Sequence, residues 1–166
     1  MTRLRTLTAP ALPQLWLAFS LLLLALLATP LRASEVLLTL TLPDRTITFD
    51  RAALEALPVA EFETTTIWTE GPQKFRGVRM RVLLDQYGVT SGMLQLTAVN
   101  DYAIEIDAGS FRADGAILAY DRNGEAMTLR TKGPLWLVYP YDSSPDFRSE
   151  LIYSNSIWQL DRIRVE

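Results

Sequence analysis

Arg130 and Lys132, directly before the turn sequence Gly133-Pro134, form the strongest pair for binding chemistry in this chain. Guanidinium and ammonium groups beside the backbone N–H groups of a turn bind phosphate, sulfonate or carboxylate. Arg76 stands next to Gly77 in a second turn and is the most favourable third contact. We therefore predict a small anionic ligand at these three basic side chains. An ordinary hairpin end is the alternative for Arg130 and Lys132.

Aromatic and polar side chains in other predicted loops complete the candidate ligand site. These residues are Trp68, Thr69, Asn100, Asp101, Tyr102 and Tyr141. Trp68 offers a face for stacking, and Asn100-Asp101-Tyr102 combines a donor, an acceptor and an aromatic surface. Tyr141 follows a buried strand, where a sheet-based pocket carries its specificity. The alternatives are core packing for Trp68 and an Asx turn for Asn100; Trp158 is predicted in the core.

The chain contains no Cys and no His, which excludes many kinds of catalysis. Thiolate nucleophiles, disulfides, imidazole bases and the usual ligands of zinc, copper and haem are therefore absent. Any catalysis would have to use carboxylates, hydroxyls, Tyr, Lys or Arg, or a bound cofactor. We predict no catalytic residue and no metal site.

The first 33 residues have the pattern of a secretory signal peptide. Arg3 and Arg5 form a short basic region, residues 15–28 are almost continuously apolar, and Pro30 precedes the small residue Ala33. The apolar stretch is shorter than the roughly 20 residues of a spanning helix, so an uncleaved anchor is the weaker alternative. We predict cleavage after Ala33, export of an unfolded chain to the periplasm or the medium, and no stable membrane insertion after cleavage.

The predicted domain, residues 34–166, is acidic and large enough for one hydrophobic core. The chain holds 16 basic and 19 acidic side chains; the leader takes three Arg and no acid, which leaves 13 and 19 and a formal charge of −6. This balance argues against nucleic acid or an anionic membrane surface as a partner. We expect no nucleic-acid partner, but a small anionic ligand or a periplasmic or membrane protein.

Hydrophobic periodicity predicts an α+β domain with more strand than helix. The strands expected in the first half are 36–42, 46–49 and 62–68. The expected helices are 51–57, with Asp50 as N-cap, and 80–87, which ends at Gly88. Residues 75–78 are expected to lead into the second helix.

The second half is predicted to be mainly β, followed by one closing strand. Its expected strands are 93–99, 102–106, 116–121, 127–130 and 158–165. Segment 127–130 is the return strand of a hairpin with an Asn123-Gly124 turn. The continuous apolar run 135–139 predicts a strand at the centre of the sheet with both faces covered. Residues 140–150 are expected to be a polar, turn-rich loop.

The order and spacing of several short motifs resemble the molybdopterin-binding domain of the sulfite oxidase family. These motifs are Phe75-x-Gly77-Val78 before Leu83-Leu84, the turn Asn100-Asp101-Tyr102, Leu118-Ala119-Tyr120-x-x-Asn123-Gly124-Glu125, the stretch from Gly133-Pro134 to Pro140, and the closing Ser156-Ile157-Trp158. The resemblance begins at about Thr46 and covers nearly all of the predicted domain. It implies a single compact sulfite-oxidase-type domain with a mixed β-sheet and a few short helices. It also makes molybdopterin the cofactor to consider.

The same resemblance exposes what the chain lacks. Enzymes of that family hold molybdenum through a Cys thiolate and bind the pterin with His and with a Lys beside the closing Trp, where Ile157 stands here. We therefore expect a non-catalytic ligand-binding or accessory module, a pseudoenzyme without a bound cofactor. Two alternatives remain. One is a protein-interaction subunit of a membrane sensor or redox system. The other is a genuine molybdopterin-dependent oxidoreductase with oxygen ligation by Thr69 or Glu70.

Overall fold

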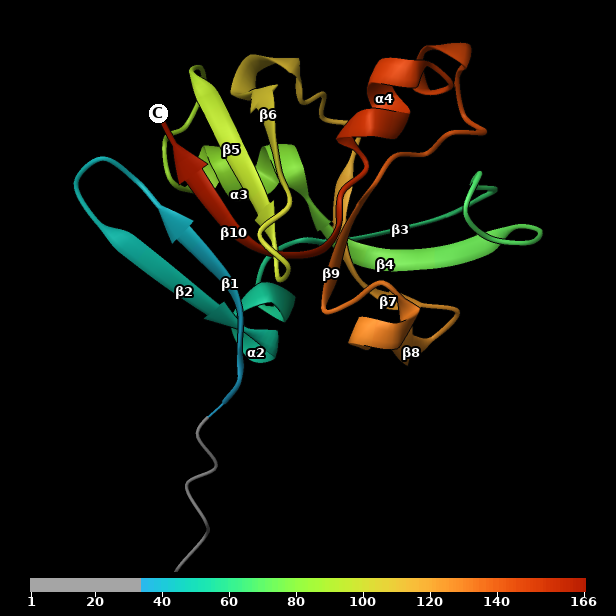
Figure 1. Ribbon diagram of the computed structural model, residues 1–166, viewed down its shortest axis with the longest axis horizontal. Coiled ribbons are helices and arrows are strands. Elements are labelled where there is room, and N and C mark those ends of the chain that lie inside the picture. Colours follow the sequence, from blue (N-terminus) through green and yellow to red (C-terminus); the bar gives the residue numbers. More distant parts are fainter. Residues whose placement is uncertain (1–33) are drawn as a thin grey trace, which may run out of the picture. The chain divides into compact units, whose positions relative to one another are not determined.

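Ten strands form one mixed sheet in the computed structural model, which describes residues 34–166 (Figure 1). They are β1 (Val36–Thr41), β2 (Thr46–Asp50), β3 (Val59–Thr64), β4 (Gln73–Arg79), β5 (Met93–Ala98), β6 (Ala103–Asp107), β7 (Ile117–Arg122), β8 (Glu125–Ala126), β9 (Leu135–Val138) and β10 (Trp158–Val165). Seven follow the order β2-β1-β10-β9-β7-β4-β3; β5 joins β10, β6 joins β5 and β8 joins β7. The predicted signal peptide, residues 1–33, lies outside the described residues.

Strand β9 lies in the middle of this order, as its apolar sequence predicts. All four of its side chains are completely buried. Strand β10 then connects the parts of the sheet. It pairs antiparallel with β9 through Trp158 and Leu160, parallel with β1 from Arg162 onward, and antiparallel with β5 along its other edge. The β1–β2 and β5–β6 hairpins are thus joined to the rest of the sheet through β10.

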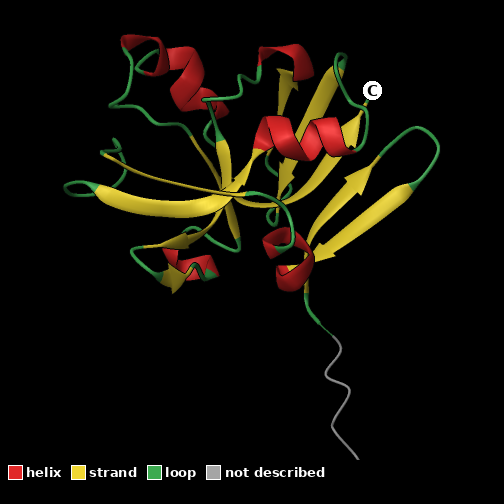
Figure 2. Ribbon diagram, turned by 180° about the vertical axis from the view of Figure 1, so that it is seen from behind, coloured by secondary structure: helices red, strands yellow, loops and turns green. Residues whose placement is uncertain are grey.

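Short helices complete the domain. They are the α-helices α2 (Arg51–Glu55), α3 (Met80–Gln86) and α4 (Glu150–Asn155) and the 3₁₀ turns η1 (Ala108–Ser110), η2 (Leu129–Thr131) and η3 (Pro145–Phe147). Helix α2 begins at the predicted N-cap, because the Asp50 carboxylate accepts a hydrogen bond from the Ala53 backbone N–H at 2.7 Å. Helix α3 buries Met80, Leu83 and Leu84 and lies across β5 and β10 in Figure 2. The predicted α+β class is confirmed.

Strands β4 and β7 approach so closely that Gly77 leaves no room for a side chain. A Cβ at this position would lie 2.0 Å from the Leu118 carbonyl oxygen. The register also shifts here, so Arg76 faces Asp121, Gly77 faces Ala119, and Tyr120 is left without a partner on β4. Residues 75–78 are therefore part of a strand paired on both edges, and not only the approach to a helix as predicted.

The return strand predicted over 127–130 is wrong. The Asn123-Gly124 turn is present, with positive φ at both residues, but the strand that follows it is only the two-residue β8. Thr128 ends the pairing. Its backbone N–H donates to the Thr131 hydroxyl at 2.8 Å, and this capping box starts η2 instead.

Two other boundaries also differ from the sequence pattern. Strand β3 covers 59–64 and not 62–68, because the Thr65 backbone N–H and hydroxyl donate to the Asp142 carboxylate at 2.5 and 2.8 Å. The predicted loop 140–150 contains η3 and leads into α4, whose N-cap is Ser149. No helix of the described chain is both long and apolar enough to cross a membrane.

Candidate functional site: an aromatic cavity beside Lys132

Trp68 is the centre of an aromatic cluster. Its ring lies 5.8 Å from Trp136, 5.7 Å from Trp158, 6.0 Å from Tyr153 and 6.2 Å from Tyr141, measured between centroids and edge-on in each case. Such edge-to-face pairs fix the rings relative to one another more firmly than apolar burial alone. The loop after β3 is thereby attached to the central strand β9, to the start of β10 and to α4.

A cavity of about 390 Å³ opens beside this cluster. Its lining residues are Trp68, Ala98, Asn100, Tyr102, Tyr153, Ser154, Ser156, Ile157 and Trp158. They come from the loop after β3, from the turn between β5 and β6, and from α4 with the start of β10. Tyr102 is 56% exposed and Trp158 37%, so aromatic faces remain accessible at this cavity. The volume is in the range of small-molecule sites.

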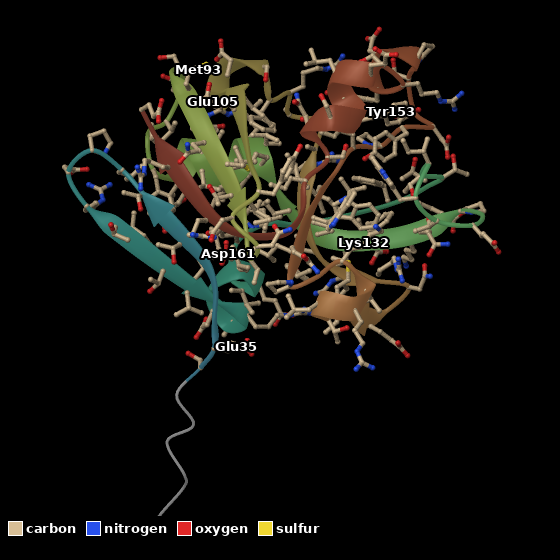
Figure 3. The ribbon with its side chains drawn as sticks, viewed as in Figure 1. Glu35, Met93, Glu105, Lys132, Tyr153 and Asp161 are labelled. Atoms are coloured by element: carbon tan, nitrogen blue, oxygen red, sulfur yellow. The ribbon has the colours of Figure 1, made fainter. Side chains whose placement is uncertain are left out.

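Lys132 stands over the ring of Trp158. Its ammonium nitrogen is 3.9 Å from that ring's centroid and 5.4 Å from the centroid of Trp136, which is cation–π geometry. The backbone explains the position: Lys132 has φ +76°, and Gln159 donates from its backbone N–H to the Lys132 carbonyl and from its side chain to the Leu129 carbonyl. Figure 3 labels Lys132 beside the central strands and Tyr153 on α4.

The Lys132 ammonium has no carboxylate partner within residues 34–166. Burial lowers the pKa of this amine, and the charge of Arg122 lowers that pKa further. An anionic group placed beside Trp158 would relieve both effects, because it would compensate a partly desolvated positive charge.

None of the three predicted cations lines the aromatic cavity; Lys132 lies over the Trp158 ring but outside the lining. Arg76 on β4 forms ion pairs with Asp121 at 3.3 Å and Glu55 at 3.7 Å, so its charge is already compensated. Arg130 on η2 is exposed and has no ion pair in the described chain. Joint contact of an anion by these residues and Lys132 stays a prediction.

Three of the remaining predicted site residues, Trp68, Asn100 and Tyr102, line the cavity. The Tyr102 backbone N–H donates to the Asn100 side-chain oxygen at 3.3 Å. This is the Asx turn that the sequence offered as the alternative for Asn100.

The other predicted site residues do not line the cavity. Asp101 pairs with Arg162 at 2.9 Å. Buried Tyr141 donates from its hydroxyl to Ser156 Oγ at 2.7 Å. The predicted residue Thr69 shares a 2.8 Å hydrogen bond with the Thr66 hydroxyl.

The sequence pattern did not identify six of the nine lining residues. Tyr153, Ser154 and Ser156 belong to α4 and its end, inside a segment adjoining the predicted loop, and Trp158 was expected in the core. The sequence does contain one signal for helix α4, because Ser149 followed by Glu150 has the pattern of an N-cap with an acidic first turn. Nothing in the local pattern indicated that this helix faces Trp68.

The side chains do not fit a thiolate-held molybdenum. The chain has no Cys, and within residues 34–166 no three His, Cys, Asp or Glu side chains gather where they could hold a metal ion. Of the proposed oxygen ligands, Thr69 is bonded to Thr66 and Glu70 is exposed.

The mixed sheet with few short helices, and the cavity beside its central strand, define a domain of the sulfite oxidase type. Residues 33–143 match the family model described as the oxidoreductase molybdopterin binding domain, and the chain belongs to that family.

One solved structure similar to this chain is the sulfane dehydrogenase SoxCD from Paracoccus pantotrophus, with a TM-score of 0.57 and 17% identity. The match covers 83% of this chain and 40% of that one, so this chain spans well under half of its length. At this identity the similarity shows the fold alone. No curated protein matches the chain.

Proposed function

We propose that this domain is an exported, non-catalytic binding module that holds a planar heteroaromatic ligand with an anionic substituent. The observation that carries the proposal is that the Trp158 ring, which lines the cavity, has 3.9 Å from its centroid the Lys132 ammonium, which has no carboxylate partner within residues 34–166. Stacking on Trp158 and Trp68 would contribute affinity for any flat ring. Lys132 would select ligands that also carry a negative charge.

Polar groups of the cavity add a way to orient such a ring. The Asn100 side chain and the Ser154 hydroxyl line the cavity beside the aromatic faces. Family membership supports a pterin-like ligand, and the donor set supports binding without molybdenum. The acidic domain repels anions at long range, so an uncompensated lysine is where a small anion would settle.

The binding test is calorimetric titration with 6-carboxypterin, a flat heteroaromatic carboxylate. We expect Trp158→Ala to weaken binding about tenfold through lost stacking. Lys132→Met should weaken it about tenfold or more, because it removes a charge-assisted contact and keeps the apolar stem. The matched control is Lys74→Met, the only other lysine, which pairs with Glu61 at 2.6 Å on β4 and β3. Equal affinities of Lys132→Met and Lys74→Met would contradict the proposal.

The oxidoreductase alternative is tested by metal analysis of protein purified from molybdate-supplied cells. We expect no stoichiometric molybdenum, because no thiolate is present to hold it. About one molybdenum per chain, retained through gel filtration, would favour the enzyme with oxygen ligation and overturn this part of the proposal.

A further inference from the structure

A second cavity, of about 610 Å³, is larger than the aromatic one. Its lining residues are Glu35, Val36, Leu37, Arg51, Val99, Tyr120, Ala126, Met127, Thr128, Leu129, Pro134 and Asp161. It shares no lining residue with the aromatic cavity.

This cavity lies where two strands diverge from β10. On that edge, β9 pairs with β10 up to Leu160, whereas β1 pairs with β10 only from Arg162 onward. Asp161 stands at the division. Because the β1 register with β10 begins at Thr39, the same edge of β1 has no partner strand at Val36 and Leu37. At Val36 and Leu37 the edge of β1 therefore has no neighbouring strand where it borders this cavity, which we call the groove.

The lining shows that backbone faces this groove. Side chains of a regular strand alternate between its two faces, so consecutive residues line one cavity along the strand's edge or at a bulge. Val36 and Leu37, the first two residues of β1, both line the groove beside Glu35, at the point where the β1–β2 register shifts. Unpaired strand edges of this kind are completed by another extended chain.

Tyr120 forms part of the wall of the groove. It is 1% exposed, and its buried hydroxyl makes no hydrogen bond within the described chain. The Arg51 guanidinium lies 4.1 Å from the ring centroid and is itself held by Glu55 and Asp121. Because the hydroxyl is closed off from the groove, Tyr120 closes one side of it without offering a polar contact.

The surroundings of the groove are apolar with an acidic border. Val36, Val99 and Leu129 are 52%, 44% and 54% exposed, so three of the exposed large hydrophobic side chains of residues 34–166 surround this one cavity. Glu35 has no ion pair in that part of the chain, whereas Asp161, also in the lining, is paired with Arg162 at 2.9 Å (Figure 3 labels both acids). Apolar side chains with flanking positive charge would complement this surface.

We propose that this groove binds an extended peptide segment of a partner protein, with alternating apolar and basic side chains, which adds as a strand to the free edge of β1. The apolar side chains contact Val99 and Leu129, and the basic ones face Glu35. The inference is independent of the ligand proposed for the aromatic cavity.

The test uses protein purified from cells that express the whole chain and a synthetic hexapeptide that alternates Lys and Val. Calorimetry measures affinity, and amide hydrogen exchange measures protection at Val36 and Leu37. We expect binding with protection of both amides, and at least tenfold weaker binding of the hexapeptide in which Glu replaces Lys.

Leu129→Asp, at an exposed position that does not threaten folding, should abolish binding. Tyr102→Phe and Trp158→Ala serve as controls in the aromatic cavity and should leave the peptide affinity unchanged. The proposal would be overturned by no binding of the Lys–Val peptide, by equal affinity for the Glu–Val peptide, or by binding without protection of Val36 and Leu37. Loss of peptide binding in Trp158→Ala would assign the peptide to the other cavity and equally overturn it.

Discussion

Trp136 shows how one side chain serves both the core and the site. It is completely buried on β9, contacts the rings of Trp68, Phe75 and Trp158, and donates from its indole N–H to the Ser156 carbonyl at 3.2 Å. Its burial is predictable, because the apolar run around it has no polar face. Its contacts are not, because Trp68 and Trp158 come from distant segments.

We expect Trp136→Ala to lower the free energy of unfolding by about 3–5 kcal/mol, a large share of a total of about 5–15 kcal/mol. The loss combines a large cavity with an orphaned Ser156 carbonyl. Urea denaturation followed by far-UV circular dichroism measures it, with Trp158→Ala, at a partly exposed position, as the comparison. An unchanged midpoint in Trp136→Ala would show that this ring is not part of the cooperative core.

The candidate cations illustrate the limit of prediction at this scale. The sequence pattern identifies Lys132 as a cation beside a turn, but its place over Trp158 depends on a left-handed backbone and on Gln159. Arg76 has an equally favourable local sequence. Its carboxylate partner Asp121 is 45 residues away, and pairing across the β4–β7 bulge cannot be read from local spacing.

At the scale of elements, one carboxylate fixes the loop that carries Trp68. Asp142, after the central strand, accepts hydrogen bonds from the Thr65 backbone N–H and hydroxyl and pairs with Arg148 at 3.0 Å. The end of β3 and the position of the Trp68 loop are thereby set by a residue 77 positions later. This is why the predicted strand extended too far: the Thr-rich pattern continues, but the pairing does not.

The pKa of Asp142 makes this link sensitive to acid. The Thr65 backbone hydrogen bond is the main cause that lowers the pKa of Asp142 below its ordinary value of 3.8. The folded state therefore binds this proton more weakly than the unfolded state, so the stabilisation is present above pH 3.8 and is lost as the pH falls through the lower folded value.

We expect the near-UV circular dichroism of the aromatic cluster to change as the pH falls below 3.8, before the far-UV signal does. In Asp142→Asn this acid-induced step should be reduced, because the amide does not titrate. Identical acid profiles of the two proteins would show that Asp142 does not hold the Trp68 loop.

At the scale of the whole molecule, the buried phenols set the alkaline limit of stability. Burial raises the pKa of Tyr139 and of Tyr141 well above their ordinary value of 10.0. The unfolded chain thus loses these protons first, so stability is complete below pH 10.0 and declines as the pH rises above it. We expect the melting temperature to be constant up to pH 10.0 and to fall as the pH rises above it. Tyr102→Phe, at an exposed tyrosine, should leave that decline unchanged, and a melting temperature constant to pH 11 would contradict the assignment.

The whole-molecule architecture was predictable only through the resemblance. Periodicity alone indicates α+β, with β9 buried at the centre, and both hold. Strand order cannot be predicted from periodicity. The first and last strands, β1 and β10, form a parallel pair between residues more than 120 positions apart. The apolar alternation in 36–42 and 158–165 is compatible with many neighbouring strands. Only the similarity of motif order to a known family therefore predicts this strand order.

The branching of β10 has a consequence for when this domain can fold. Neither the β1–β2 hairpin nor the β5–β6 hairpin is joined to β9, β7, β4 and β3 except through β10, the last strand of the domain to be synthesised. Until that strand leaves the ribosome, the fragments have edges but no common sheet, and the long-range pairing that closes them is slow to form. The sheet therefore cannot be completed before residues 158–165 have been synthesised.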